Sequence, residues 1–193
     1  MNKISFTPFP VQTTDRLLLR KLTVKDKSVL FSLRTDKKVN QYIKRPVQQS
    51  ESDTGTFINK ISKGIRENKV IFWAICLKEA PSLIGTICLW NISEDGTVAE
   101  LGYELSPNHQ GMGLMNEAIN TILIYGFDTL QLNMITAYTH KHNAASIKIL
   151  LKHGFVFNPN IKDDDNINNV IFELYNKTIN QETKKLQNDN STS

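Results

Sequence analysis

The order of hydrophobic and polar positions predicts strands and helices in alternation along most of the chain. Residues 70–77, 83–90 and 98–105 have the composition and alternation of strands. The segments between them, 79–82 and 93–96, have the composition of turns. Short turns between successive strands favour an antiparallel meander, which we expect at the centre of the fold.

Helical spacing appears before the meander, following an expected strand at 17–22. Thr23 with Asp26 can cap a first helix, and Ser50 can cap a second, with Asp53 in its first turn. The apolar positions expected on these two helices are Val24, Leu30, Phe31 and Leu33 in the first, and Phe57, Ile58, Ile61 and Ile65 in the second. The polar segment between the helices, 40–46, is expected to cover the edge of a cleft.

After the meander the pattern predicts a helix, a strand, a helix and a final pair of strands. The first helix carries apolar residues at Ala118, Ile119, Ile122 and Leu123. A strand at 136–139 precedes a second helix that begins at the N-cap Asn143 and ends before Gly154 at C′. Its expected buried stripe is Ile147, Leu150 and Leu151. The final strands lie near 155–157 and 170–175, separated by the acidic turn 162–165.

Composition fits one ordinary globular domain, expected over residues 1–179, with a polar tail at 180–193. The 193 residues are 40% hydrophobic and 22% charged, with a formal net charge of +4 and dispersed Lys and Arg. This dispersal argues against a nucleic-acid surface. No apolar run suits a bilayer span or a secretory signal, so we expect a cytoplasmic protein without a membrane partner.

The sequence gives no pattern typical of a metal site, so no metal is expected. Cys76 and Cys88 occur on neighbouring expected strands and are predicted to be buried small hydrophobic residues. His140 and His142 have no carboxylate or cysteine nearby at a spacing that would complete a ligand set.

The segment most informative about function is 108–118, where Gly111 and Gly113 stand between an expected strand and an expected helix. Free backbone N–H groups at a helix start favour an anion, and glycine permits its close approach. A Walker A loop would need Lys and Ser or Thr where Leu114 and Met115 stand, and a dinucleotide fingerprint would need glycine or alanine at Asn116. A diphosphate site of another kind and a plain turn both remain open.

This loop resembles that of the GNAT acetyltransferase superfamily, Gln/Arg-x-x-Gly-x-Gly/Ala, with Asn108 standing where the family has Gln or Arg. The segment 143–155, Asn-x-x-Ser-Ile-x-x-Leu-x-x-x-Gly-Phe, is similar to a second block of the family, and 14–20 resembles the opening strand of its Rim-type branch, the ribosomal-protein N-terminal acetyltransferases. The resemblance runs from about residue 13 to residue 175.

The resemblance implies a GNAT acyl-CoA N-acyltransferase fold of α/β (α+β) class. Its sheet is mixed and mostly antiparallel, with splayed central strands flanked by helices. It also implies acetyl-CoA as co-substrate, bound through its diphosphate by backbone amides of the loop and through its pantetheine arm by the strand before it. The expected cofactor-binding residues are Tyr103, Glu104, Leu105, Asn108, Gln110, Gly111, Met112, Gly113, Leu114, Met115, Asn143 and Ser146.

The implied catalytic residues are Glu100 and Ser146. Glu100 stands where Rim-type relatives often carry a glutamate that acts as general base, and Glu104 is the rival carboxylate. Ser146 stands where relatives are thought to protonate the leaving thiolate. The alternatives are a surface carboxylate at Glu100 and a local helix-start hydrogen bond at Ser146. Aromatic or amphipathic candidates for the acceptor pocket are Tyr42, Trp73, Trp90, Tyr138 and His140.

The expected activity is direct acetyl transfer in a ternary complex, because neither cysteine is placed to carry an acyl group. The acceptor is a primary amine, either a protein N-terminus or a small molecule, and the protein is expected to be a monomer or homodimer. A non-catalytic acyl-CoA-binding or regulatory protein is the alternative, since it would keep the glycine loop without needing Glu100 or Ser146.

Overall fold

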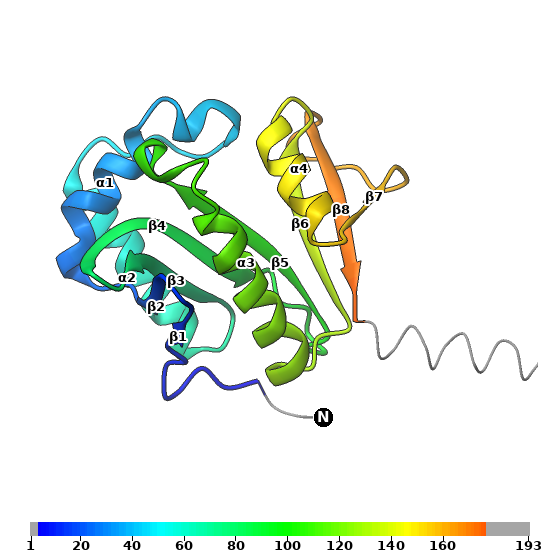
Figure 1. The fold of residues 1–193 in the computed structure, drawn as a ribbon, viewed down its shortest axis with the longest axis horizontal. Helices are drawn as coiled ribbons and strands as arrows, with labels where there is room; N and C mark the ends of the chain where they lie inside the picture. The colour runs from blue at the N-terminus through cyan, green and yellow to red at the C-terminus, as the bar shows by residue number, and fades with distance from the viewer. Residues whose placement is uncertain (1–3, 177–193) are drawn as a thin grey trace, which may run out of the picture.

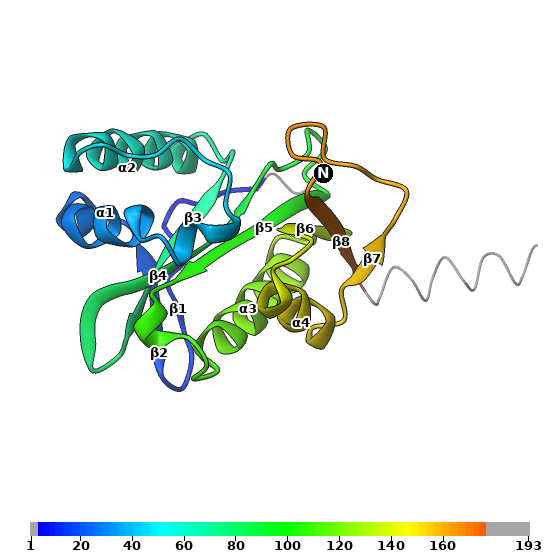
Figure 2. The same ribbon diagram turned by 90° about the horizontal axis from the view of Figure 1, so that it is seen from above.

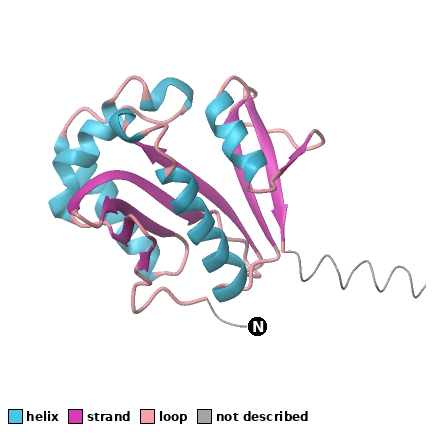
Figure 3. Cartoon of the chain, viewed as in Figure 1, coloured by secondary structure: helices cyan, strands magenta, loops and turns pink. Residues whose placement is uncertain are grey.

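The computed structural model describes residues 4–176, which form one eight-stranded sheet with helices on both faces (Figures 1 and 3). The tail predicted at 180–193 and the last residues of the predicted domain lie outside the described residues. The strands are β1 Gln12–Thr13, β2 Leu17–Lys21, β3 Ile71–Leu77, β4 Ala80–Trp90, β5 Val98–Leu105, β6 Met134–His140, β7 Val156–Asn158 and β8 Asn169–Tyr175. The α-helices are α1 Lys27–Thr35, α2 Glu51–Arg66, α3 Leu114–Ile124 and α4 Ala144–Lys152.

Short helical turns complete the chain: the 3-10 turns η1 Val24–Asp26, η2 Val39–Tyr42 and η3 Pro107–His109, and the π-helical turn η4 Tyr125–Thr129. Strand order across the sheet is β1-β2-β3-β4-β5-β6-β8-β7. Every recorded pair is antiparallel except β5 with β6. The predicted meander of β3, β4 and β5 is therefore confirmed. Its third strand, β5, also forms the single parallel pair among the described strands, with β6.

The two faces of the sheet carry different helices. Figure 2 shows α1 and α2 on one face and α3 and α4 on the other. The central strand β3 is an almost continuous apolar run with both faces buried, as expected for a strand covered by helices on each side. Helix α3 buries the predicted Ala118, Ile119, Ile122 and Leu123 against the sheet. This packing holds the start of α3 at the end of β5.

Several predicted boundaries and contacts differ from the structure. β4 already begins at Ala80, so the turn lies at Lys78 and Glu79 and not at the predicted 79–82. The helix expected directly after Thr23 opens with η1, which leaves the Val24 side chain exposed, while Leu30 and Leu33 of α1 are buried. In α4, Leu150 faces the core, but Leu151 is 54% exposed, so its predicted place in the buried stripe was wrong. The face of α4 that packs against the core carries Ile147, Ile149 and Leu150, and Leu151 lies beside it.

Caps at two helices agree with the sequence. The Ser50 hydroxyl accepts the Asp53 backbone N–H at the start of α2, and the Asn143 side chain accepts the Ser146 backbone N–H at the start of α4. Gly154 follows α4 with a positive φ of 84°, as the C′ position of a helix favours. These local signals determine where α2 and α4 begin and end.

Replacing Ile122 with alanine is expected to reduce the free energy of unfolding by about 2–5 kcal/mol, because the side chain is fully buried between α3 and the sheet. Ile124→Ala is the matched control, since Ile124 is 54% exposed on the same helix, and it should change stability by less than about 0.5 kcal/mol. Urea denaturation measures both. Equal losses from the two variants would contradict this packing of α3.

Candidate functional site

The centre of the site is a gap between the two parallel strands. β5 and β6 pair only through Val98 with Met134, Ala99 with Ile135 and Glu100 with Thr136. Beyond Glu100, β5 pairs with β4 alone and β6 with β8 alone. Figure 1 shows the two strands diverging from this point. The backbone of Leu101 to Leu105 therefore has one edge without a partner strand, where a ligand with amide groups can hydrogen-bond.

At the far end of β5, the glycine loop leads into α3. Gly111 and Gly113 have positive φ angles of 75° and 77°, a conformation that glycine adopts without strain. A Cβ built on Gly111 would have nothing within 4 Å, so the loop is open on that side. Gln110 donates its side-chain amide to the Leu105 carbonyl at 2.9 Å and thereby ties the loop to β5. Open glycines at a helix N-terminus fit an anionic diphosphate.

The remaining loop residues predicted to bind the cofactor differ in what they present. Asn108 and Met112 have exposed side chains next to the open glycines. Leu114 and Met115 bury their side chains in the core, so only their backbone N–H groups, in the first turn of α3, are available to a ligand. Asn108, the motif position that departs from the family pattern, keeps its side chain exposed to solvent.

Glu100 lies on the face of β5 that α1 and α2 cover, together with Gly102 and Glu104. Their cross-strand partners on β4 are Trp90, Cys88 and Thr86 respectively. The Glu100 carboxylate accepts a hydrogen bond from the Asn91 side chain at 3.2 Å. Burial raises the pKa of Glu100 to about 7, with the charge of Asp163 acting in the same direction. A carboxyl group that titrates near neutral pH can take up a proton from a reacting group.

Glu104 occupies the same face but is engaged by cations. Its carboxylate accepts Arg45 Nη1 at 2.6 Å and Thr86 Oγ1 at 3.1 Å, and Arg34 Nη1 lies 3.6 Å away. These partners come from α1, from the segment after η2 and from β4. The rival carboxylate therefore has its oxygens occupied by structural partners, which distinguishes it from Glu100.

The opposite face of β5 carries Tyr103, whose side chain reaches α4. Its hydroxyl lies 2.8 Å from the Ser146 hydroxyl, and either oxygen can donate. Burial raises the pKa of Tyr103 to about 12, so this phenol remains protonated at neutral pH. Tyr103 was expected among the cofactor-binding residues, but its contact with Ser146 was not predicted. The alternation of side chains along β5 was the signal for its direction, and no pattern linked it to α4.

Two of the predicted catalytic residues thus lie on opposite faces of the same gap. Glu100 lies on the side of α1 and α2. Ser146 lies in the first turn of α4, on the other side, where its backbone N–H donates a hydrogen bond to the Asn143 side chain at 3.1 Å. A reactant lying in the gap would meet a proton acceptor on one side and a hydroxyl donor on the other.

The aromatic candidates divide between surface and core. Trp90 and Tyr138 are partly exposed near Glu100, and Tyr42 stacks on His140 with ring centroids 5.3 Å apart. Trp73 is fully buried and donates its indole N–H to the Pro10 carbonyl at 2.8 Å, so its proposed place in an acceptor pocket was wrong. It lies in a strand covered on both faces, where large aromatic side chains pack well.

The segment 40–46 crosses from the first half of the molecule to the second. Besides the contact of Tyr42 with His140, Lys44 donates to the Asp165 carbonyl at 2.6 Å, and Arg45 binds Glu104. This agrees with the expectation that the segment covers an edge of the cleft. It lies on the α1 and α2 side, above the gap.

Both cysteines are free and buried. Burial, with the nearby charges of Glu100 and Glu104, raises the pKa of Cys88 to about 12, and burial also raises the pKa of Cys76. Thiols in this state are poor nucleophiles, because the reactive species is the thiolate. This agrees with the prediction that neither cysteine carries an acyl group.

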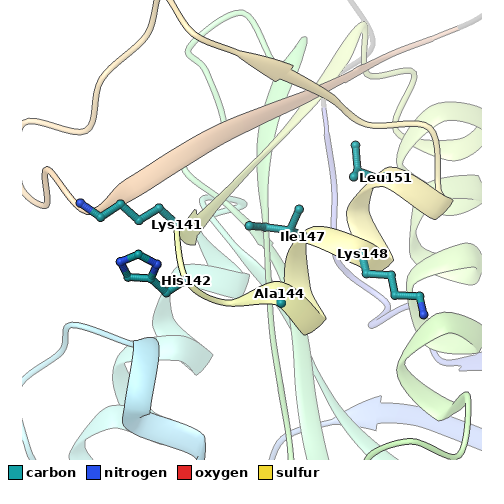
Figure 4. A pocket seen from close by; sticks show the side chains of 6 residues that line it. All are labelled: Lys141, His142, Ala144, Ile147, Lys148 and Leu151. Carbon is teal, nitrogen blue, oxygen red and sulfur yellow. The ribbon is translucent and has the colours of Figure 1, made fainter.

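An open cavity of about 520 Å³ lies along α4. Figure 4 shows its lining: Ala144, Ile147, Lys148 and Leu151 from α4, and Lys141 and His142 from the segment just before it. Among residues 4–176, no helix is long and apolar enough to cross a membrane, and no group of three or more His, Cys, Asp or Glu side chains could hold a metal ion.

Comparisons with known proteins give one consistent result. Residues 16–156 match the model of the family described as acetyltransferase (GNAT) domain. The chain is 33% identical over 147 residues to the uncharacterised N-acetyltransferase YoaA of Bacillus subtilis, covering 76% of this chain and 83% of that protein. It is also 27% identical over 86 residues to the ribosomal-protein-serine acetyltransferase of Escherichia coli, covering 45% of this chain and 48% of that protein.

Among solved structures, the chain resembles the microcin C7 self-immunity acetyltransferase MccE in complex with acetyl-CoA and AMP. The TM-score is 0.75 at 22% identity, over 90% of this chain and 99% of that one. At this identity the likeness concerns the fold.

The pKa of Glu100 is expected to lie near 7, well above the ordinary value of 4.5. Carbon NMR of labelled glutamate side chains measures it, and Glu117 provides an internal control. Burial acts to raise the pKa of Glu117, but hydrogen bonds from Thr14 and Arg16 outweigh that effect and lower it.

The same shift has a consequence for stability. The folded protein retains the Glu100 proton to about pH 7, whereas the unfolded chain releases it near 4.5. The stability due to this proton is complete below the lower value and is lost as the pH rises through the higher one. Glu100→Gln should therefore gain stability relative to the wild type between these pH values, and a constant difference would contradict the shifted pKa.

Proposed function

The chain belongs to the GNAT acetyltransferase domain family, and on that premise we propose that it moves an acetyl group from acetyl-CoA directly to a primary amine within a ternary complex. Acetyl-CoA is the co-substrate of this family. The observation that carries the proposal is the divergence of β5 and β6 just after Glu100, with the open glycine loop at the other end of the unpaired stretch.

The residues present fit the coenzyme. Gly111 leaves space at the start of α3 for the diphosphate, supported by the backbone N–H groups from Gln110 to Met115. The unpaired edge of Leu101 to Leu105 supplies amide groups for the pantetheine arm, and Asn143 lies across the gap at the start of α4. When bound there, acetyl-CoA supplies the activated acyl thioester.

On the α1 and α2 side, Glu100 accepts the proton of the incoming amine. A general base works best when its pKa lies near the working pH, because it must both accept a proton and release it again. The pKa of Glu100, about 7, meets this condition near neutral pH. A backbone N–H between Tyr103 and Leu105 polarises the carbonyl as the amine nitrogen attacks it. The carbon–nitrogen bond forms and the carbon–sulfur bond breaks, so that the electron pair leaves on sulfur.

On the other side of the gap, Ser146 donates a hydrogen bond and then a proton to the departing sulfur. A serine hydroxyl alone is a weak acid, but the Tyr103 hydroxyl lies 2.8 Å away and can return a proton to it. Burial raises the pKa of Tyr103 to about 12, so the phenol still carries its proton when the sulfur departs. After that proton has passed to Ser146, a proton from solvent restores the Tyr103 hydroxyl. The exchange leaves the thiol form of the coenzyme and the acetylated amine.

The acceptor amine binds next to an acidic and aromatic surface around Tyr138. Glu100, Asp163 and Glu173 bear negative charge around Tyr138. Such a surface attracts an ammonium group, which must lose one proton to solvent before the neutral amine attacks and gives its next proton to Glu100. We propose either a protein N-terminus or a small-molecule amine as the acceptor. The relatives include a ribosomal-protein-serine acetyltransferase, and the similar structures include MccE, a self-immunity acetyltransferase for microcin C7.

Thiol release from acetyl-CoA across a panel of amines and N-terminal peptides tests the activity. We expect release above background with at least one amine class. A protein that binds acetyl-CoA but is inert throughout the panel would contradict the proposed transfer and support a binding or regulatory role instead.

With an active amine, Glu100→Gln should lower kcat by about 10²–10⁴-fold and remove the pH dependence near 7. Glu104→Gln is the matched control, because it lies on the same face but serves Arg34 and Arg45. It should lower the melting temperature and leave the midpoint of the pH profile unchanged. If Glu104→Gln instead abolished the pH dependence, the assignment of the base to Glu100 would be wrong.

Gly111→Asp is expected to abolish acetyl-CoA binding in calorimetry, because a carboxylate would occupy the space for the diphosphate. Gly111→Asn has nearly the same shape, tolerates the positive φ equally well and lacks the charge. It should retain part of the affinity. Undiminished binding by the aspartate variant would rule out this location for the diphosphate.

A further inference from the structure

The glycine loop is held from behind by a segment almost a hundred residues earlier in the chain. Arg16, just before β2, donates Nη1 to the Met112 carbonyl at 3.0 Å. It also donates Nε to Glu117 Oε2 at 2.8 Å, and its own backbone N–H reaches Glu117 Oε1 at 2.9 Å. The Thr14 hydroxyl binds the same carboxylate. The loop and the first turn of α3 are therefore tied to the edge of β2 at several points.

The hydrogen bond to Met112 determines the direction of the next amide. In a planar trans peptide the C=O and the N–H point in opposite directions. Holding the Met112 carbonyl toward Arg16 therefore points the Gly113 N–H away from Arg16. A Cβ built on Gly113 would lie 3.5 Å from Arg16 Nη2, whereas one on Gly111 would have nothing within 4 Å. Arg16 thus packs behind Gly113, while the loop is open at Gly111.

The ion pair has a second effect at the same helix end. Glu117 lies in the first turn of α3, where its negative charge is favourable to the helix but would repel a diphosphate bound at the same N-terminus. Arg16 Nη2 lies 2.8 Å from Glu117 Oε2, so the two charges compensate each other. The guanidinium is half-exposed and the carboxylate mostly covered.

We propose that Arg16 is a positioning residue for the coenzyme diphosphate. It turns the Gly113 N–H toward the ligand through the Met112 carbonyl, and it neutralises Glu117 beside the bound anion. This rests on the proposed binding of acetyl-CoA at the glycine loop. No other described residue is recorded as donating a side-chain hydrogen bond to the Met112 carbonyl.

The experiment compares two acyl donors. S-acetylpantetheine lacks the diphosphate, so its use should not depend on the orientation of the Gly113 amide. Arg16→Ala should weaken CoA binding by about tenfold or more, from the lost hydrogen bond and the uncompensated Glu117 charge. Its kcat at saturating acetyl-CoA should stay within about twofold of the wild type, and its kcat/KM with S-acetylpantetheine should be unchanged.

The double variant Arg16→Ala, Glu117→Gln separates the two effects. Removing the carboxylate charge should recover part of the lost CoA affinity, because the repulsion disappears while the amide remains unoriented. Arg16→Lys keeps a positive charge near Glu117 and serves if the alanine variant does not fold. It should bind CoA less tightly than the wild type, because a single ammonium group replaces the guanidinium that reaches both Met112 and Glu117, and its kcat/KM with S-acetylpantetheine should be unchanged.

Arg20→Ala is the control for general damage. Arg20 lies on β2, the strand that follows Arg16, and pairs with Asp26 at 2.6 Å, away from the loop. It should lower the melting temperature with unchanged CoA affinity. Equal loss with both acyl donors, or wild-type CoA affinity in Arg16→Ala, would overturn the positioning role. A wild-type protein that does not bind CoA would instead contradict the proposed function.

Discussion

The early end of hydrogen bonding between β5 and β6 is the constraint on which the site depends. A sheet normally gains from continuing its ladder, because every buried backbone N–H and C=O needs a partner. Here the parallel pairing stops at Glu100 and Thr136, and each strand continues with a different antiparallel neighbour. The result is a slot lined by main-chain groups through the middle of an otherwise continuous sheet. It brings two helical layers and the unpaired edges of β5 and β6 to the same place.

Side-chain alternation along β5 then gives the slot two chemically different sides. Glu100 and Glu104 point toward α1 and α2, and Tyr103 points toward α4. One strand thus presents an acidic group to one layer and a phenol to the other, without any loop having to cross between them. The two carboxylates differ although they are similar in sequence context. Two arginines surround Glu104, whereas Glu100 has the Asn91 amide and the Trp90 indole beside it and the negative charge of Asp163 nearby.

Much of this arrangement could be predicted from local sequence. The glycine loop, the cap at Asn143, the meander and the face shared by Glu100 and Glu104 all follow from patterns spanning a few residues. Contacts between distant segments could not be predicted. The Arg34, Arg45 and Glu104 cluster, the Tyr103 hydroxyl beside Ser146 and the Arg16 contacts with Glu117 join residues about 40 to 100 positions apart. Errors at Trp73 and Leu151 had the same origin, since composition does not tell which side of an element meets another layer.

The bridge formed by residues 40–46 gives the two halves of the molecule a mechanical coupling outside the sheet. Tyr42 on His140, Lys44 on the Asp165 carbonyl and Arg45 on Glu104 join the layer of α1 to β6, to the loop before β8 and to β5. β5 and β6 themselves share only three residue pairs, at one end of the gap. How far the two strands separate at the other end therefore depends on the contacts that residues 40–46 make across the gap. Substitutions in this short polar stretch would therefore alter the width available to an acyl chain without changing any strand.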